Sequence, residues 1–351
     1  IKKTLHCYND TDGILAVSVS GGTPFTTDNP YIYVWKKLNK LTSTYEEIEE
    51  TASPFKDKLS EGTYSVEVRD ANYDNTNPSA CIGILENLII IPAEELKFTY
   101  TKENASCYGE SNGSIQLNIT GGKAPYKIIT NTGTVDNLNG TVSGLSVGTY
   151  TLKVIDENDC PSIEQKIEIG EPEKSVYIDS ETVVITPATG FGLPTGKIAI
   201  TAAGGTAPYN YTWENSSGTS VGTDSSILNN VIAGIYKVLI TDSKGCQFLD
   251  NYTIEQPTKP TIAATPTQSK CNGLLGSLEA VAAGGAIFNQ NQSERVYSYK
   301  LKNKTSGITT TISGNTASFS NIADGSYNLT ATDVSGVDSD IIDLEFRQPT
   351  P

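Results

Sequence analysis

Histidine and methionine are nearly absent from the 351-residue sequence, which has no Met and one His, His6. A single imidazole excludes any mechanism that needs two, and a Ser-His-Asp triad would have to be built around this one residue. We therefore expect a protein that is not an enzyme. The six cysteines are far apart, and none has the close spacing of zinc-binding pairs. No zinc site is expected either.

Basic residues and long apolar runs are also scarce. Lys and Arg number 25 against 40 Asp and Glu, which gives a net charge of −15. Such a surface repels phosphate backbones and anionic lipid, so we expect neither nucleic acid nor a membrane as a partner. No segment approaches the roughly 18 apolar residues of a membrane span, and no leader precedes the first strand pattern. The start without Met suggests a mature product or a piece of a longer chain.

The sequence contains an internal repeat instead. An L-x-x-G-x-Y-x-V-x-V-x-D pattern occurs four times, with its tyrosines 86, 86 and 91 residues apart. A Tyr-rich alternating segment and, before that, an alternating run that ends in Gly-Gly precede each occurrence. The Gly-Gly pairs begin at Gly21, Gly121, Gly204 and Gly284. Such regularity predicts four copies of one structural unit.

A proline closes each copy and predicts the domain boundaries, because proline cannot donate to a strand ladder. These prolines are Pro92, Pro172, Pro257 and Pro349. We name the predicted domains copy one (1–93), copy two (94–172), copy three (173–257) and copy four (258–351). Copy one carries insertions at 36–58 and 71–80. Its stretch 36–50 predicts a short helix or an extended hairpin.

Each copy has about seven short alternating segments, separated by turn residues and with little helical periodicity. This pattern predicts an all-β fold, a tandem array of four immunoglobulin-like β-sandwich repeats. A Tyr two residues after a Gly, at the start of a late strand, is typical of the tyrosine corner, in which the hydroxyl bonds back to the preceding turn. The predicted corners are Tyr64, Tyr150, Tyr236 and Tyr327.

The combined motifs resemble the SprB-type repeat of gliding-motility adhesins of the Bacteroidetes. They are C-x-x-x-x-(N/D)-G, G-G-x-x-P-Y-x-Y-x-W, L-x-x-G-x-Y-x-V-x-V-x-D-x-x-x-C and a terminal Q-P or E-P. The resemblance covers essentially the whole chain and is best in copies two and three. It implies part of a long, secreted, extracellular filament on the cell surface, exported by type IX secretion and used in attachment and gliding.

The cysteines occupy two positions of the repeat. Cys7, Cys107 and Cys271 precede the first marker strand, whereas Cys81, Cys160 and Cys246 follow the third. In an immunoglobulin-like sandwich these positions lie at opposite poles, too far apart for a disulfide within one copy. The early cysteine of one copy faces the late cysteine of the next. This predicts the pairs Cys7–Cys160 and Cys107–Cys246, with Cys81 and Cys271 open to neighbouring repeats. Pairing within copies and reduced thiols remain alternatives.

The predicted bridges would stiffen the array, and the joint between copies three and four, which lacks both cysteines, would stay a hinge. Acidic residues flank the bridges, so a Ca²⁺ site of Asp10, Asp12, Asp156 and Asp159 is a further hypothesis. Turn formation by these residues is the simpler interpretation. No other cofactor is expected.

The sequence thus predicts a stalk segment of a cell-surface adhesin whose partners are neighbouring repeats of the same long chain. Two alternatives remain open. The repeats could bind surface polysaccharide themselves, with or without Ca²⁺, or they could be an accessory array on a secreted hydrolase.

Overall fold

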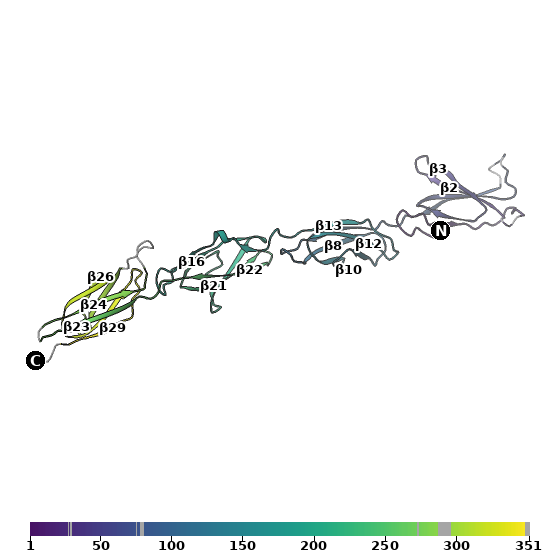
Figure 1. Cartoon of the computed structure of the whole chain (residues 1–351). Coiled ribbons are helices and arrows are strands. Elements are labelled where there is room, and N and C mark those ends of the chain that lie inside the picture. Colours follow the sequence, from purple (N-terminus) through teal and green to yellow (C-terminus); the bar gives the residue numbers. More distant parts are fainter. Residues whose placement is uncertain are drawn as a thin grey trace. The chain divides into compact units, whose positions relative to one another are not determined.

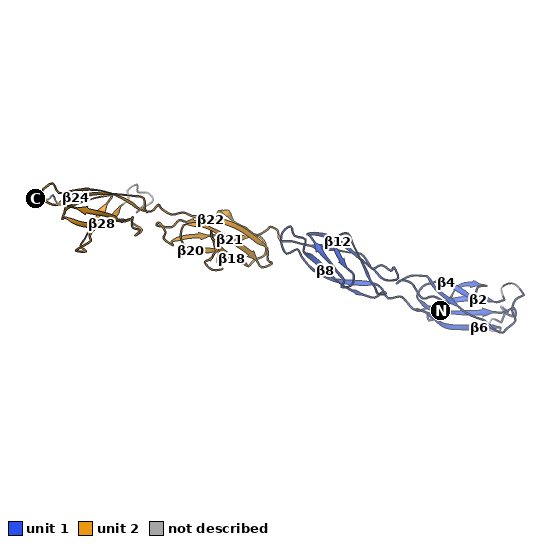
Figure 2. Cartoon of the chain, turned by 90° about the horizontal axis from the view of Figure 1, so that it is seen from below, with its two compact units in different colours: residues 1–171 blue, residues 172–351 orange. Residues whose placement is uncertain are grey.

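The computed structural model describes residues 1–26, 28, 30–74, 76–77, 81–271, 274–286 and 296–347. In this part of the chain the regular structure is β-strand except for one short 3-10 helix, η1 (Ser180–Thr182) (Figure 1). The all-β prediction is therefore confirmed. The chain forms two compact units, Ile1–Glu171 and Pro172–Pro351, coloured separately in Figure 2. Each unit contains two of the predicted copies.

Copy two is a sandwich of two antiparallel sheets. Its strands are β7 (Lys97–Glu103), β8 (Gly113–Thr120), β9 (Lys127–Thr130), β10 (Thr134–Asp136), β11 (Thr141–Leu145), β12 (Gly148–Ile155) and β13 (Gln165–Ile169). The sheet orders are β10-β11-β8-β7 and β13-β12-β9, the four-plus-three arrangement of an immunoglobulin constant-type domain. From Tyr150 onward every second residue of β12 is buried, and both sheets supply one core around Ile115, Val142, Leu152 and Ile167.

Copy one follows the same plan with a longer hairpin. Its strands are β1 (Gly13–Ala16), β2 (Ile32–Asn39), β3 (Thr44–Thr51), β4 (Phe55–Leu59), β5 (Gly62–Arg69) and β6 (Ile82–Ile90). The first insertion forms the hairpin of β2 and β3, which extends the sheet β3-β2-β5-β6 and faces the pair β1-β4. Trp35 lies fully buried in the core between the sheets. Of the two sequence-based options for this stretch, the structure therefore has the hairpin.

Copy three contains more and shorter strands. They are β14 (Tyr177–Ile178), β15 (Val184–Thr186), β16 (Gly196–Ala199), β17 (Ala202–Ala203), β18 (Tyr209–Asn215), β19 (Ser220–Val221), β20 (Ile227–Val231), β21 (Gly234–Asp242) and β22 (Gln247–Ile254). They form the sheets β15-β16-β20 and β19-β18-β21-β22 and the short pair β14-β17. Trp213 of β18 is buried and donates its indole N–H to the Ser225 carbonyl at 2.9 Å.

Copy four pairs a three-stranded with a four-stranded sheet. Its strands are β23 (Thr261–Thr267), β24 (Gly276–Ala283), β25 (Tyr297–Asn303), β26 (Thr309–Gly314), β27 (Thr316–Ile322), β28 (Gly325–Thr332) and β29 (Ile342–Phe346). The orders are β23-β24-β27 and β26-β25-β28-β29. The core between them includes Tyr299, Phe319 and Leu329. The fourth strand of copy four, β26, therefore lies at the edge of the sheet that contains the third strand, β25. The fourth strand of copy two, β10, lies instead at the edge of the sheet that contains the fifth strand, β11.

None of the described strands crosses a predicted boundary at 93, 172 or 257. The boundaries themselves stay predictions. Pro349, the predicted closing proline of copy four, lies outside the described residues.

Candidate functional site at the joints between copies

The four corner tyrosines anchor the turn before the central strand of each copy. Each donates its hydroxyl to the backbone carbonyl four residues earlier, as in a tyrosine corner. The bonds are Tyr64 to Ser60 (2.8 Å), Tyr150 to Ser146 (3.0 Å), Tyr236 to Ile232 (2.9 Å) and Tyr327 to Ala323 (3.2 Å). They fix the start of β5, β12, β21 and β28, the strands that lead to the late cysteine position.

An aspartate at the end of the repeat pattern ties two loops together at one pole of every copy. Its Oδ2 accepts the backbone N–H of the residue after Gly-Gly, and its Oδ1 accepts N–H groups of the late turn. The Oδ2 bonds are Asp70 with Thr23 (2.8 Å), Asp156 with Lys123 (2.9 Å), Asp242 with Thr206 (2.7 Å) and Asp333 with Ala286 (2.7 Å). The sequence pattern contained this aspartate, but its only predicted role was Ca²⁺ binding, and only for Asp156; recurrence before a turn was the available signal for the clamp.

The Gly-Gly pairs are required by this clamp. Both glycines of each pair have positive φ, a conformation that favours glycine. A Cβ on the second glycine would also lie 2.4–3.0 Å from the aspartate Oδ2, as at Gly205 and Gly122. The first glycine accepts a tyrosine hydroxyl through its carbonyl, for example Gly121 from Tyr126 at 2.9 Å. The Gly-Gly pair and the aspartate, which are the most regular features of the repeat sequence, therefore form the end of the sandwich that carries the late cysteine position.

A disulfide joins the early cysteine of copy one to the late cysteine of copy two. The Cα atoms of Cys7 and Cys160 are 5.5 Å apart, although 153 positions separate them in the sequence. This distance lies within the usual range of about 4.4–6.8 Å. Asp156 accepts the N–H of Cys160 at 2.9 Å, so the aspartate clamp of copy two positions one half of the bridge.

The acidic residues predicted to hold Ca²⁺ form hydrogen bonds in the loops around this bridge. Asp10 accepts the N–H of Cys7, and Asp12 accepts that of His6. A hydrogen bond from Lys3 to Asp12 lowers the pKa of this carboxyl below its ordinary value. Asp156 serves the clamp, and Asp159 donates its backbone N–H to the Asp156 carbonyl. The geometry thus assigns these residues to turns, and Ca²⁺ binding stays a prediction.

Within the described ranges, only His6, Cys7 and Cys160 form a group of three metal-ligand side chains close enough to share an ion. Both cysteine sulfurs of this group belong to the disulfide, so they are not thiolate ligands.

The other four cysteines differ in exposure and in position. Cys81 and Cys271 are exposed free thiols. Cys107 belongs to the first unit and the largely buried Cys246 to the second. Their predicted pairing would connect the two units and stays a prediction, as does the pairing of Cys81 and Cys271 with further repeats.

The residue before two of the closing prolines holds the early loop of its own copy. Glu171 accepts the N–H of Gly109 at 2.6 Å, two residues after Cys107. Gln256 accepts the N–H of Gly192 at 2.7 Å in copy three. The terminal E-P and Q-P motifs therefore fix the early position relative to the linker, a role that the sequence analysis missed.

In the second unit, copy three meets copy four without cysteine. Gly190 lies six residues before Gly196, as Cys7 does before Gly13. A Cβ at Gly190 would be 2.2 Å from Oγ of Ser335, which belongs to the late turn of copy four. Ser335 Oγ also donates to Asp333 at 2.6 Å. Here the early and late loops make direct contact, and the absent side chain at Gly190 allows the close approach.

Asp333, at this contact, has a lowered pKa. Burial alone would raise the pKa of the carboxyl, but hydrogen bonds from the Ser335 hydroxyl and from the backbone N–H groups of Ala286, Val337 and Ser335 outweigh burial. The ionised form is therefore the one that holds the loops of copy four.

Several solved structures of multidomain proteins are similar to this chain at low identity. The N-terminal eight immunoglobulin domains of the Down syndrome cell adhesion molecule are 14% identical, with a TM-score of 0.29; the match covers 97% of this chain and 46% of that one. Three N-terminal domains of the bacteriophage RB49 outer capsid protein Hoc are 12% identical, with a TM-score of 0.31 and coverage of 74% and 100%. A titin fragment is 12% identical, with a TM-score of 0.27 and coverage of 73% and 100%.

No curated protein sequence matches the chain. No helix in the described part of the structure is long and apolar enough to cross a membrane. A family model described as "SprB repeat" matches residues 99–135 in copy two and 182–218 in copy three. These are the two copies in which the sequence motifs resembled that repeat best, so the resemblance is confirmed there. Two segments of the chain, one in copy two and one in copy three, therefore match the SprB repeat.

Proposed function

We propose that the chain is a non-enzymatic stalk segment of a secreted adhesin, used in surface attachment and gliding, in which disulfides between successive repeats stiffen the array. The Cys7–Cys160 bridge is the main support, because it connects copy one to copy two. The disulfide gives copies one and two a second connection beside the linker at Pro92. Two connections restrict the bending of one copy against the other more than a single linker does. Persistent disulfides also require an oxidising environment, which agrees with the cell exterior and with export by type IX secretion.

The partners in this proposal are neighbouring repeats of the same long chain. Cys81 and Cys271 support it, since both are exposed and free at the late position of copy one and the early position of copy four. Each would pair with a further repeat of the long chain. The proposed Cys107–Cys246 bridge would continue the series between copies two and three.

Stiffness is tested by the spread of distances between two spin labels, one in copy one and one in copy two, measured by pulsed electron resonance. We expect a narrow distribution in the oxidised chain and a broad one in the variant Cys7→Ser/Cys160→Ser. Two labels within copy two are the matched control and should not change. Equal widths with and without the bridge would contradict the stiffening role.

The stalk role is separated from polysaccharide binding by replacement in a cell that carries the adhesin. The four copies are replaced by four unrelated β-sandwiches of equal length. A stalk predicts that attachment survives this replacement and decreases when the copies are deleted. Loss of attachment after replacement would instead favour repeats that bind surface polysaccharide, and addition of a Ca²⁺ chelator to the natural chain would then test for metal dependence.

A further inference from the structure

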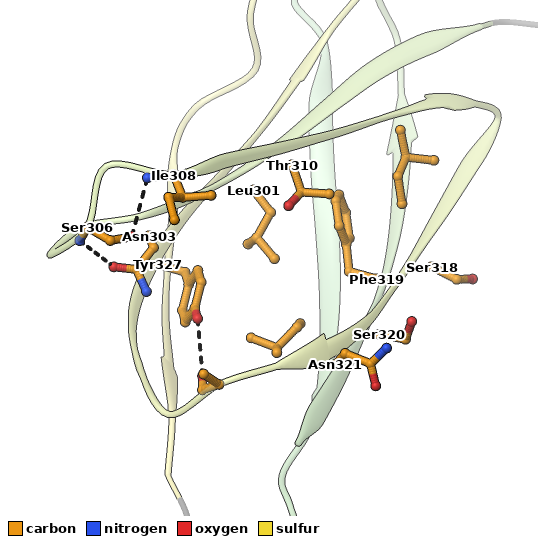
Figure 3. Close-up of a pocket in the computed structure, with 13 residues that line it drawn as sticks. Leu301, Asn303, Ser306, Ile308, Thr310, Ser318, Phe319, Ser320, Asn321 and Tyr327 are labelled. Atoms are coloured by element: carbon orange, nitrogen blue, oxygen red, sulfur yellow. Dashed lines mark hydrogen bonds between the residues drawn. The ribbon is translucent and has the colours of Figure 1, made fainter. Parts of the chain in front are cut away.

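An open cleft lies at one edge of copy four, between β26 and β27 (Figure 3). It has a volume of about 460 Å³, within the roughly 300–1,000 Å³ range of ligand sites. Figure 3 shows the side chains of Leu301, Thr310, Phe319 and Tyr327 between the two strands. None of the lining residues is charged, although the chain carries a net charge of −15.

The cleft lies along a strand edge that the fourth strand covers in copy two; in copy four, as in copies one and three, the corresponding strand joins the other sheet. In copy two, β10 pairs with the outer edge of β11, with Val135 opposite Val142. β27 is the equivalent of β11, because Ile322 and Leu145 both lie three residues before the corner glycine. In copy four β26 pairs with β25 instead. Among the described strands, β27 therefore has a partner only on its inner side, β24.

The same edge is closed in copies two and three by a glycine-containing segment. A Cβ at Gly133 would lie 2.9 Å from Cγ1 of Val142, and a Cβ at Gly222 would lie 2.7 Å from Cδ1 of Leu228. Val142 and Leu228 stand at the position of Phe319 in copy four. A Cβ at Gly307, in the β25–β26 turn, would meet nothing within 4 Å, and the same is true of Gly218 in the β18–β19 turn of copy three. In copy four, Phe319 lines the open cleft instead.

The walls of the cleft match an extended peptide. Leu301, Phe319 and Ile322 make an apolar floor, and the exposed Thr310 and Ser320 provide hydroxyl groups at the rim. The outer edge of β27 adds backbone N–H and C=O groups that can extend the sheet. In copy two the corresponding space takes Thr134-Val135-Asp136, whose Val135 packs against the core.

We propose that this cleft is a peptide-binding site that accepts a short β-strand from another polypeptide along the edge of β27. The strand presents one β-branched apolar residue between small polar ones, in the manner of Thr134-Val135-Asp136. The main chain of the peptide pairs with β27, and the apolar side chain lies over Phe319. The inference is independent of the stalk role, since it concerns an edge of copy four away from the joint.

The test uses the whole chain and a synthetic peptide with the sequence of residues 132–138, TGTVDNL. Binding is followed by NMR through the methyl groups of Ile312 and Ile322, which line the cleft, with Ile185 in copy three as a remote reference. We expect saturable shifts at the first two and none at the third. A peptide with Asp in place of its Val, and one with methylated backbone nitrogens, should fail to bind because each lacks one of the two interactions.

Two neighbouring substitutions provide a matched pair on the protein. Thr310 lines the cleft, and the adjacent Thr311 is absent from its lining, as expected for alternating side chains of a strand; both are exposed. Thr310→Arg should weaken peptide binding at least about tenfold because it places a charge and bulk in the cleft. Thr311→Arg should leave binding unchanged.

Two results would overturn the proposal. In one, both arginine variants affect peptide binding equally or the natural peptide does not bind. In the other, neutral disaccharides shift the cleft methyl groups while the peptide does not, which would make the cleft a sugar site.

Discussion

The joint in the first unit and the joint in the second unit bring the same two loops together by different means. The first has Cys7 and Cys160 in a disulfide, whereas the second has Gly190 against Ser335 in the equivalent loops. Val337 stands where the late cysteine would be, four residues after Asp333. The comparison indicates that the loops meet without cysteine. The disulfide is therefore an addition to an existing contact, and it makes that contact covalent.

The largest expected difference between the joints follows removal of the bridge. Cys7→Ser/Cys160→Ser should lower the free energy of unfolding of the first unit by about 2–4 kcal/mol, because the unfolded chain regains the freedom of a long loop. Thermal unfolding in the presence and absence of a reducing agent measures this change. The variant Cys81→Ser is the control and should unfold as the natural chain does. An unchanged first unit after reduction would show that the bridge adds no stability.

The second joint should be sensitive to a single methyl group. Gly190→Ala places a Cβ 2.2 Å from Ser335 Oγ and should destabilise the second unit by about 1–3 kcal/mol, the usual cost of overpacking. Ser335→Gly in the same chain should restore part of the loss, because the new Cβ also lies 2.8 Å from Cδ1 of Leu193. Gly83→Ala is a suitable control, since a Cβ there meets nothing within 4 Å and the glycine lacks positive φ. Equal effects of G190A with and without Ser335 would place the strain elsewhere.

A smaller effect is expected from acid, and in the second joint the group concerned is Asp333; the pKa of Asp12, beside the first bridge, is lowered as well. Because the folded-state pKa of Asp333 is lowered, its contribution to stability is present above the ordinary value of 3.8 and is lost as the pH falls through the folded value. Unfolding of the second unit measured across this range should show the loss, and Asp333→Asn should remove this part of the pH dependence. Ser335→Gly should raise the pKa of Asp333, since one hydrogen bond to the ionised form disappears. The same profile in natural chain and D333N would contradict the assignment.

The smallest effect is chemical and leaves the fold unchanged. In the oxidised chain a thiol reagent should modify Cys81 and Cys271, which are exposed and free, and should leave Cys7 and Cys160 unmodified. Peptide mapping by mass spectrometry identifies the modified residues. Modification of Cys7 without prior reduction would show that the first joint is open in solution.

The fold was predictable because its signal is local. Alternating apolar residues, Gly-rich turns and the recurring Gly-x-Tyr pattern each specify a strand or a turn, and these patterns occur in all four copies. The hairpin of β2 and β3 was only half predicted, since mixed charge along 36–50 fits a helix as well as two strands. The pairing of β2 with β5, which includes the contact of Lys36 with Glu67 at 2.7 Å, supports the strand form. Such long-range pairs are not visible in one sequence.

The pairing of Cys7 with Cys160 was predictable because the topology of the sandwich places the early and the late cysteine positions at opposite ends of each copy. The contact between Gly190 and Ser335 had no comparable signal, because nothing in either residue type marks a close approach. The same holds for the cleft. Whether the fourth strand pairs with β25 or with β27 depends on loop length and packing, and β10 and β26 look equally like strands in the sequence.

The offset pairing at the first joint has a consequence for how such a chain can change length. The bridge uses the early cysteine of one repeat and the late cysteine of the following one, so a repeat with both cysteines, such as copy one or copy two, carries one half of a connector at each end. Duplication of such a repeat, or its deletion from between two others of the same kind, therefore leaves matching halves at the new junction. A gene that encodes such an array can gain or lose units by recombination, and each product still has compatible ends.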